Sequence, residues 1–309
     1  MTEPRLSVLL TVVDGGEALR RCLRALLSQQ HAPAMEILIP YDSTVNTVPS
    51  IVDEVRRDGH EIRALDLGQL ETTRPARSHG GQHELIDRRR TAGLTASRAG
   101  IVAILEDRGV PRLDWAATAM RLHAELPHEV IGGAIENGRP GTLNWAVYFC
   151  DFGRYQRPFR AGPRRYISDT NVVYKRSALE RTRGIWKTRY HEPLVHWALE
   201  RNGASLFLSP DLVVDQIRDD LSLMKLLDER LAWGRLFGAI RAGETSRVKR
   251  VVRLVCSPLV PLVLFLRIVR DQLAKRAALG RLVRAAPATI MLLTAWAIGE
   301  AAGTLTARS

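Results

Sequence analysis

The chain has 309 residues, of which 46% are hydrophobic and 25% are charged, and its formal net charge is +12. This composition excludes a disordered chain and suffices for one large α/β domain with an appendage. Cys22, Cys150 and Cys256 lack paired spacing, which argues against a disulfide framework or a zinc site and fits a reducing compartment. The first apolar run is too short for a signal peptide and is broken by Asp14-Gly15-Gly16, so we expect the main domain to stay in the cytosol.

The first third of the chain alternates apolar runs with amphipathic segments. We predict strands at residues 6–12, 35–40, 61–67 and 101–105, and helices at 17–28, 49–57 and 82–97. This order predicts an α/β fold with a mainly parallel sheet and helices on both faces.

Residues 115–242 show a more mixed pattern. We predict helices at 115–126, 178–183, 191–202 and 221–241, and strands at 130–135 and 166–174. An aromatic stretch from Trp145 to Tyr155 either lines a pocket or belongs to the core. The composition changes near Ala242-Gly243, so we predict a main domain at 1–242 and a tail at 243–309.

Two adjacent acids, Glu106 and Asp107, follow the predicted strand at 101–105. Ligands of open α/β sheets bind outside the carboxyl ends of the strands, so these acids are placed for a metal ion or another ligand. If the strand continues, its adjacent side chains point to opposite faces and only one acid reaches a given cation. If the chain has already turned, both can reach it. The alternative is a pair of acids at a helix N-terminus, where they favour the helix dipole.

Most of the positive charge belongs to the tail. From Arg241 to Arg284 there are eleven basic residues and two acids, which flank an apolar segment at 254–266 and precede a longer one at 285–305. This pattern favours an anionic membrane surface over nucleic acid. The first segment contains two prolines and is too short to span a bilayer, whereas the second is long enough. We predict attachment at the cytoplasmic face of the cell membrane, with the first segment dipping into or lying along the interface and the second spanning or returning.

Several short motifs occur in the order of a known enzyme family. Asp14 follows the first strand, where the family has a Pro-Thr-Tyr-Asn-like turn, and Asp42 keeps the second acid of an Asp-Asp-Gly-Ser motif. Arg90 begins an Arg-x-x-Gly element, Glu106-Asp107 falls on an Asp-x-Asp region, and Glu192 falls on the second acid of a Glu-Asp pair. Over residues 6–240 the chain therefore resembles the family 2 glycosyltransferases, which have the GT-A, Rossmann-like nucleotide-sugar-binding fold.

The resemblance implies a nucleotide-sugar site with a divalent cation, Mn²⁺ or Mg²⁺. It assigns the cation to Asp107, with Glu106 either as a co-ligand or as an acid behind the ligands. It implies that Thr11 and Asp42 hold the nucleoside, although Thr11 could equally be an ordinary strand-end residue. Asp14 belongs to the same nucleotide site, and Arg90 faces the diphosphate.

Three residues depart from the family pattern. Val13 replaces an aromatic residue that would lie against the nucleobase, and Tyr41 replaces the first acid of its pair. Arg108 stands where the third acid of the metal motif is often found. This arginine either substitutes in part for cation charge on the diphosphate or neutralises a site that no longer works.

The resemblance also implies inversion at the anomeric carbon in a single displacement, which requires a base for the acceptor hydroxyl. Glu192 is the expected base. It shares a helix face with His196 at i+4, so a contact between them either tunes the pKa of Glu192 or caps a turn. The alternative for Glu192 is an acid that favours the dipole at a helix N-terminus.

The stretch at 229–235 lacks the Gln-x-x-Arg-Trp signature of the family's processive synthases. We therefore predict a non-processive transferase that moves a hexosyl or similar group from a nucleoside-diphosphate sugar to a hydroxyl acceptor, lipid-linked or otherwise of the cell envelope. Two other readings stay open. One is a degenerate relative that binds nucleotide without turnover, and the other is a membrane-surface scaffold.

Overall fold

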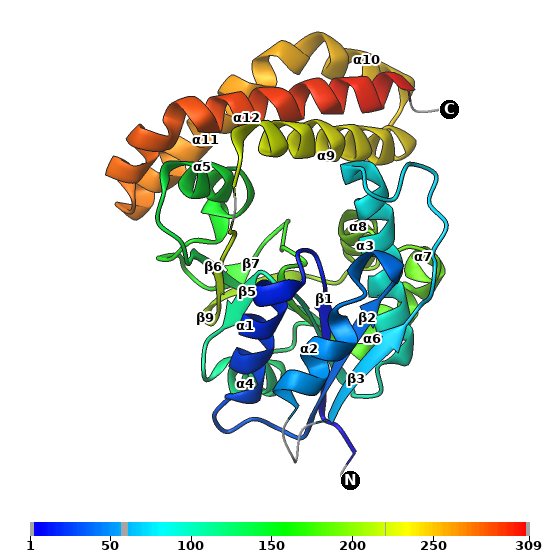
Figure 1. Cartoon of the computed structure of the whole chain (residues 1–309). Coiled ribbons are helices and arrows are strands. Elements are labelled where there is room, and N and C mark those ends of the chain that lie inside the picture. Colours follow the sequence, from blue (N-terminus) through cyan, green and yellow to red (C-terminus); the bar gives the residue numbers. More distant parts are fainter. Residues whose placement is uncertain (1–2, 57–60, 220, 307–309) are drawn as a thin grey trace. The chain divides into compact units, whose positions relative to one another are not determined.

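The computed structural model describes residues 3–56, 61–219 and 221–306 (Figure 1). The last residue of the helix predicted at 49–57 and the last three of the tail lie outside the described residues. The chain divides into two compact units. The first comprises residues up to 76, 81–136 and 159–217, and the second comprises 77–80, 137–158 and the chain from 218 onward. This division differs from the boundary predicted at residue 242, because the helix at 223–243 packs with the C-terminal helices.

The first unit begins with a parallel half-sheet, as predicted. Its strands are β1 (Leu6–Thr11), β2 (Met35–Tyr41), β3 (Glu61–Asp66) and β4 (Ile101–Glu106), in the order β3-β2-β1-β4. The connecting helices are α1 (Gly16–Leu27), α2 (Val48–Val55) and α3 (His79–Ala96), with a short 3₁₀ turn, η1 (Ser43–Val45). The carboxyl ends of these strands meet at one edge of the sheet, so the residues that follow them are brought together.

The other half of the sheet is antiparallel. In the described residues the sheet has nine strands, and it continues from β4 through β8 (Asn171–Lys175), β6 (Val130–Asn137), β9 (Leu206–Gln216) and β5 (Gly109–Pro111), with β7 (Gly162–Pro163) paired to β9. The helices of this half are α4 (Trp115–Glu125), α6 (Arg176–Arg181), α7 (Arg183–Trp186) and α8 (Glu192–Arg201). The fold is therefore a mixed α/β sheet. β5, β7 and β9 were not predicted from the sequence, and the strand predicted to begin at residue 166 begins at Asn171.

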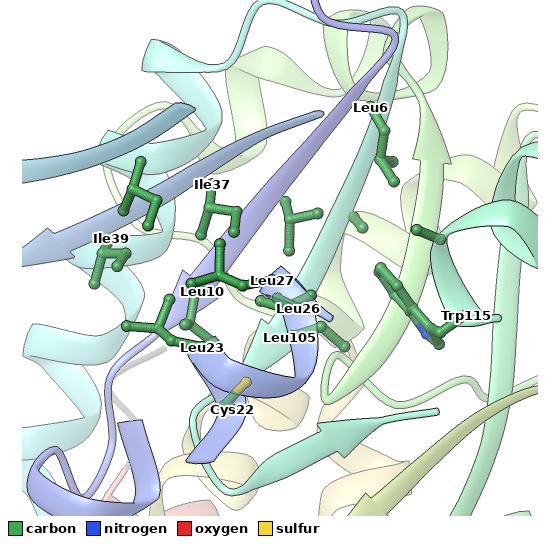
Figure 2. Close-up of a cluster of buried hydrophobic side chains, with 14 of the residues drawn as sticks. Leu6, Leu10, Cys22, Leu23, Leu26, Leu27, Ile37, Ile39, Leu105 and Trp115 are labelled. Carbon is green, nitrogen blue, oxygen red and sulfur yellow. The ribbon is translucent and has the colours of Figure 1, made fainter. Parts of the chain in front are cut away.

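Helices cover both faces of this sheet, as predicted. Apolar residues of α1 recur three and four positions apart, and they pack with alternate residues of β1 and β2, as Figure 2 shows for Leu23, Leu26, Leu10 and Ile37. The same core takes in α2 and α4. The opposite face is covered by α3, α6, α7 and α8 around a second core. Each fully buried leucine contributes roughly 1.5–3 kcal/mol, so these two cores hold the strand ends in place.

The second unit is helical. It contains α5 (Thr142–Asp151), α9 (Leu223–Gly243), α10 (Arg247–Cys256), α11 (Val260–Lys275) and α12 (Leu279–Thr306), with 3₁₀ turns η2 (Gly153–Tyr155) and η3 (Ser257–Leu259). The aromatic stretch of the sequence analysis is therefore mainly the helix α5, and Trp145 and Phe149 are buried in it. Buried Arg230 of α9 forms an ion pair with Asp151, so part of the 229–235 stretch has a structural partner.

Helices α9 and α12 lie side by side along their length (Figure 1). Glycines allow this close approach. A Cβ atom added at Gly238 of α9 would lie 2.2 Å from the carbonyl oxygen of Glu300, and one at Gly303 of α12 would lie 2.0 Å from that of Arg235. Part of the apolar face of α12 is therefore buried against α9.

Two helical segments are long and apolar enough to cross a membrane. The most apolar 18-residue window within residues 247–275 has a mean hydropathy of 2.0 and none of it is buried, whereas the window within residues 279–306 has a mean hydropathy of 1.5 and is 44% buried. On α10, Val248, Val251 and Val255 are exposed at helical spacing, and Leu262 and Leu266 are exposed on α11. The first apolar segment of the tail was predicted to be too short to span, but it forms part of a helical stretch of sufficient length. Its apolar side chains are more exposed than those of α12, although α11 also packs against α12.

Candidate active site

The predicted site residues of the first unit gather where the parallel strands end. Thr11, Asp42 and Glu106 end or follow β1, β2 and β4, and Arg90 comes from α3. Glu192 begins α8. Because the strand register fixes β1 between β2 and β4, the segments after these three strands are neighbours.

Glu106 and Asp107 point to opposite sides of the sheet edge. Glu106 is paired in register with Thr11 and ends β4, and the Asp107 amide donates to the Thr11 carbonyl at 3.0 Å as the chain enters a turn at residues 107–108. Glu106 then lies 3.0 Å from Arg90, whereas Asp107 faces the turn after β1. The chain has thus turned after Glu106, which is one of the two alternatives left open by the sequence, yet the two acids have different partners and do not meet at one cation.

Asp107 holds the β1–α1 turn. Its carboxylate is fully buried and accepts the backbone N–H groups of Val13, Asp14 and Gly15 at 3.0, 3.1 and 2.6 Å. Burial, followed by the nearby charge of Asp14, raises the pKa of Asp107 to about 7. The residue predicted to bind metal is thus engaged by the backbone, and it sets the conformation of residues 13–15.

Arg108 and Asp14 form a bidentate ion pair. The Arg108 Nε and Nη2 atoms donate to the two Asp14 carboxylate oxygens at 2.7 and 2.6 Å. The Arg108 side chain is 12% exposed and that of Asp14 is 39% exposed. This pair lies beside the turn that Asp107 holds.

Asp42 is buried against an arginine that the sequence analysis missed. Arg89 is fully buried, donates from Nε to Asp42 at 2.6 Å, and donates to the Val12 carbonyl and to Thr44 Oγ1 at 2.8 Å each. The other Asp42 oxygen accepts the Thr44 N–H and hydroxyl groups. Asp42 therefore joins the end of β2 to the end of β1 through Arg89.

Arg90 forms ion pairs with two carboxylates. It lies 3.0 Å from Glu106 and 2.6 Å from Asp169, and its Nε is 3.3 Å from Thr11 Oγ1. Asp169, which the sequence analysis also missed, is held close to other acids. Burial, with Glu192 and Glu106 acting against the favourable charge of Arg90, raises the pKa of Asp169 to about 7.

Glu192 lies next to this cluster. One of its oxygens accepts the Asp169 N–H at 3.3 Å, and the other lies 3.2 Å from His196 Nδ1, as the i+4 spacing predicted. His196 Nε2 is 2.6 Å from the Tyr174 hydroxyl, which is 2.7 Å from that of Tyr190. The Glu192 side chain keeps 20% of its surface exposed. It thus accepts one hydrogen bond, lies beside His196 and is still reachable from solvent.

The carboxylates of this site do not fit a resident divalent cation. Among residues 3–56, 61–219 and 221–306, no three His, Cys, Asp or Glu side chains are grouped so that they could hold a metal ion. Each acid has another partner: backbone N–H groups for Asp107, and arginines for Asp14, Asp42, Glu106 and Asp169. The predicted metal site is therefore not carried into the proposed function.

The two missed residues carried different signals in the sequence. Arg89 stands within the run Arg88-Arg89-Arg90 on a predicted helix, where consecutive side chains are about 100° apart, so Arg89 and Arg90 serve different strands. Asp169 lies in the loop before β8 and follows no strand of the parallel half. Nothing in its neighbours along the chain marked it.

The second unit contains a separate cavity of about 450 Å³. Its lining includes Arg139, Arg281 and Arg284, without an acid among the lining residues. The Arg281 guanidinium carbon lies 4.5 Å from the centroid of the Trp145 ring, so this arginine is held against an aromatic wall. The cavity suits an anionic group.

No family model and no curated protein matches this chain. Solved structures that share this fold include glycosyltransferases. The mannosyltransferase PcManGT from Pyrobaculum calidifontis, in complex with GDP-Man and Mn²⁺, aligns with a TM-score of 0.61 and 14% identity, over 99% of this chain and 88% of that one. TarS 1-349 from S. aureus, in complex with UDP-GlcNAc, aligns with a TM-score of 0.54 and 13% identity, over 94% and 81%. The shared fold agrees with the resemblance to glycosyltransferases, and the assignment to family 2 stays a prediction.

Proposed function

We propose that this chain is an inverting, non-processive glycosyltransferase that moves a sugar from a nucleoside-diphosphate sugar to a hydroxyl acceptor. One observation carries the proposal: arginine–carboxylate pairs gather at the carboxyl ends of β1, β2 and β4, in a fold whose solved relatives bind nucleotide sugars. Guanidinium groups pair with phosphate oxygens as readily as with carboxylates, so this edge suits a diphosphate.

The donor site is built around residues 11–15. We assign the nucleoside to the turn that Asp107 and Arg89 hold from two sides, with Asp14 at its exposed end. Thr11 and Asp42 are buried and bonded within the protein, so they act as supports of the nucleotide site. Arg108 and Arg90 are the candidates for the diphosphate.

Glu192 is the candidate base. A carboxylate that takes a proton from the acceptor hydroxyl must be fixed in orientation and reachable, and Glu192 meets both conditions. The Asp169 backbone N–H donates to Glu192, so Asp169 is an acidic neighbour of the candidate base. Burial and the nearby charge of Glu192 raise the pKa of Asp169 to about 7, so Asp169 is a neighbouring group that can hold a proton near neutral pH.

We place the protein at the cytoplasmic face of the membrane, attached through α10 and α11. Support comes from the exposed apolar side chains of these helices together with the basic residues of α10. An amphipathic helix of this kind lies in the interface with its apolar face in the lipid. A lipid-linked acceptor follows as the acceptor class to try first.

The test combines binding with turnover. The full-length protein in detergent is incubated with uridine, guanosine and thymidine diphosphates, and its thermal unfolding is followed, because a ligand of the folded state raises the melting temperature. The matching nucleotide sugars are then assayed for transfer and hydrolysis. Stabilisation with turnover supports the enzyme. Stabilisation without turnover of any sugar favours a nucleotide-binding protein, a second candidate supported by Val13 and Tyr41 at the donor site.

A further inference from the structure

We infer that the guanidinium of Arg108, in place of a divalent cation, compensates the diphosphate charge of the donor. The inference rests on the proposed function and adds to it the identity of the charge-compensating group. Its basis is the set of partners that the acids and arginines of the donor site have.

The acids of the donor site are engaged by other partners. A divalent ion bound to a nucleotide takes one or two protein carboxylates together with phosphate oxygens. Here Asp107 is enclosed by three backbone N–H groups, and freeing its oxygens would release the turn at residues 13–15. Glu106 points to the other side of the sheet edge and pairs with Arg90. Neither acid is therefore available to share a cation with the other.

Arg108 already binds a pair of anionic oxygens. It follows directly after Asp107, at the end of the central β4 strand, and its fork grips the two oxygens of Asp14. A diphosphate presents a pair of oxygens with similar spacing and more charge, so it can take the place of the carboxylate on the same fork. Asp14 is 39% exposed, and its displaced carboxylate can turn to water at little cost.

In the absence of nucleotide, Asp14 therefore serves as an internal counter-ion for Arg108. This arrangement explains why the position that usually carries an acid can carry an arginine. The charge that a metal ion would bring is part of the chain, and an aspartate keeps it neutralised until the donor arrives.

The experiment measures dissociation constants for uridine and guanosine diphosphates, by calorimetry on the full-length protein, in EDTA and in Mn²⁺. We expect constants that agree within about twofold under the two conditions. We expect Arg108→Gln to weaken binding in EDTA by about tenfold or more, because a charge-assisted bidentate contact is lost. Arg112→Gln is the matched control, since Arg112 lies on the same segment and makes a longer, exposed pair with Asp215 at 3.5 Å.

Each outcome separates the inference from the proposed function. Binding that occurs only with Mn²⁺ overturns the inference and leaves the proposed function standing. Equal weakening by Arg112→Gln and Arg108→Gln also overturns it, because a general loss of positive charge then explains the effect. If no nucleoside diphosphate binds under either condition, thymidine diphosphate included, the proposed function itself fails. The comparison of EDTA with Mn²⁺ uses the unaltered protein, so it does not depend on the folding of a variant.

Discussion

The two units of the molecule differ in the kind of side chain that they bury and the kind that they expose. In the candidate site of the first unit, charged side chains are buried and paired with one another, as for Asp42 and Arg89, which are 1% and 0% exposed. In the second unit apolar groups are outside, as for Val255, which is 75% exposed. A ligand of the first unit must therefore replace a protein partner, whereas the second unit needs a partner that the described chain does not supply. Changes in the first unit should alter chemistry, and changes in the second should alter attachment.

The largest effect expected in the first unit comes from Glu192→Gln. The variant keeps the size and most hydrogen bonds of the side chain but cannot take a proton, so turnover should fall roughly 100-fold or more. Nucleotide affinity and membrane attachment should stay unchanged. Steady-state transfer assays check this, with Glu200→Gln on the same helix as the control. Wild-type turnover in Glu192→Gln would remove the base from this position.

The matching change in the second unit places charges on the exposed apolar face. Val251→Glu with Leu262→Glu should reduce partitioning to anionic vesicles by roughly 100-fold, because each apolar side chain loses about 1.5–3 kcal/mol of burial in lipid. Transfer to a water-soluble acceptor should be retained. Vesicle co-sedimentation measures the partitioning, and Leu113→Glu, at an exposed apolar site of the first unit, is the control. Unchanged sedimentation would show that these helices do not attach the chain.

Variants of the basic cavity in the second unit test whether the cavity favours anionic lipids. Arg281→Gln with Arg284→Gln should weaken binding to phosphatidylglycerol vesicles by about 1 kcal/mol per charge, and binding to neutral phosphatidylcholine much less. Arg267→Gln with Arg270→Gln removes the same net charge outside the cavity. A larger loss from the first pair than from the second identifies the cavity as the phosphate site. Equal losses, screened equally by salt, would show only a general attraction of charge.

The α9–α12 contact is expected to be sensitive to a single methyl group. Gly238→Ala should destabilise the protein by about 1–3 kcal/mol, because the added Cβ meets the backbone of α12. Gly243→Ala, in the same helix with nothing within 4 Å of the added Cβ, should be neutral or slightly stabilising. Thermal unfolding in detergent distinguishes the two. Similar melting temperatures for both variants would mean that the helices separate without cost.

The last expected effect concerns the pH dependence of stability. The native pKa of Asp107 is raised to about 7 from 3.8, so between these values the folded chain binds a proton more tightly than the unfolded chain. The contribution of Asp107 to the free energy of unfolding is therefore present below about pH 4 and falls as the pH rises to about 7. The advantage of the parent over Asp107→Asn should shrink across this window, with about 2–4 °C in melting temperature for each kcal/mol. Parallel melting curves across the window would contradict the assignment.

The parallel half of the first unit could be predicted well from the sequence, because buried strands read as continuous apolar runs. β9 was missed because Pro210 and Asp211 interrupt its pattern, and a proline usually argues against a strand. Helix α5 was missed although Trp145, Tyr148, Phe149 and Phe152 follow helical spacing, since their aromatic character suggested a pocket lining.

The candidate site was predictable in position but not in pairing. Acids and arginines could be assigned to strand ends, yet which arginine serves which acid depends on the helix face, as Arg89 and Arg90 show. In the tail, hydropathy favoured the segment at 285–305 as the span. Hydropathy could not reveal that α12 packs against glycines of α9, whereas the more apolar α10–α11 segment stays exposed.

The glycine-lined contact of α9 with α12 has a practical consequence for heterologous expression. Ending the chain at residue 243 would strip α12 from α9 and expose the groove at Gly234 and Gly238, which invites aggregation. The two helices run parallel, since Phe237 lies against Trp296 and Arg241 pairs with Glu300. The end of α9 and the start of α12 therefore lie at opposite ends of the pair, roughly 35 Å apart at about 1.5 Å per helical residue, and α10 and α11 carry the chain back. An internal excision of α10 and α11 would delete the exposed apolar face and keep the helix pair only if a long, flexible linker replaced them.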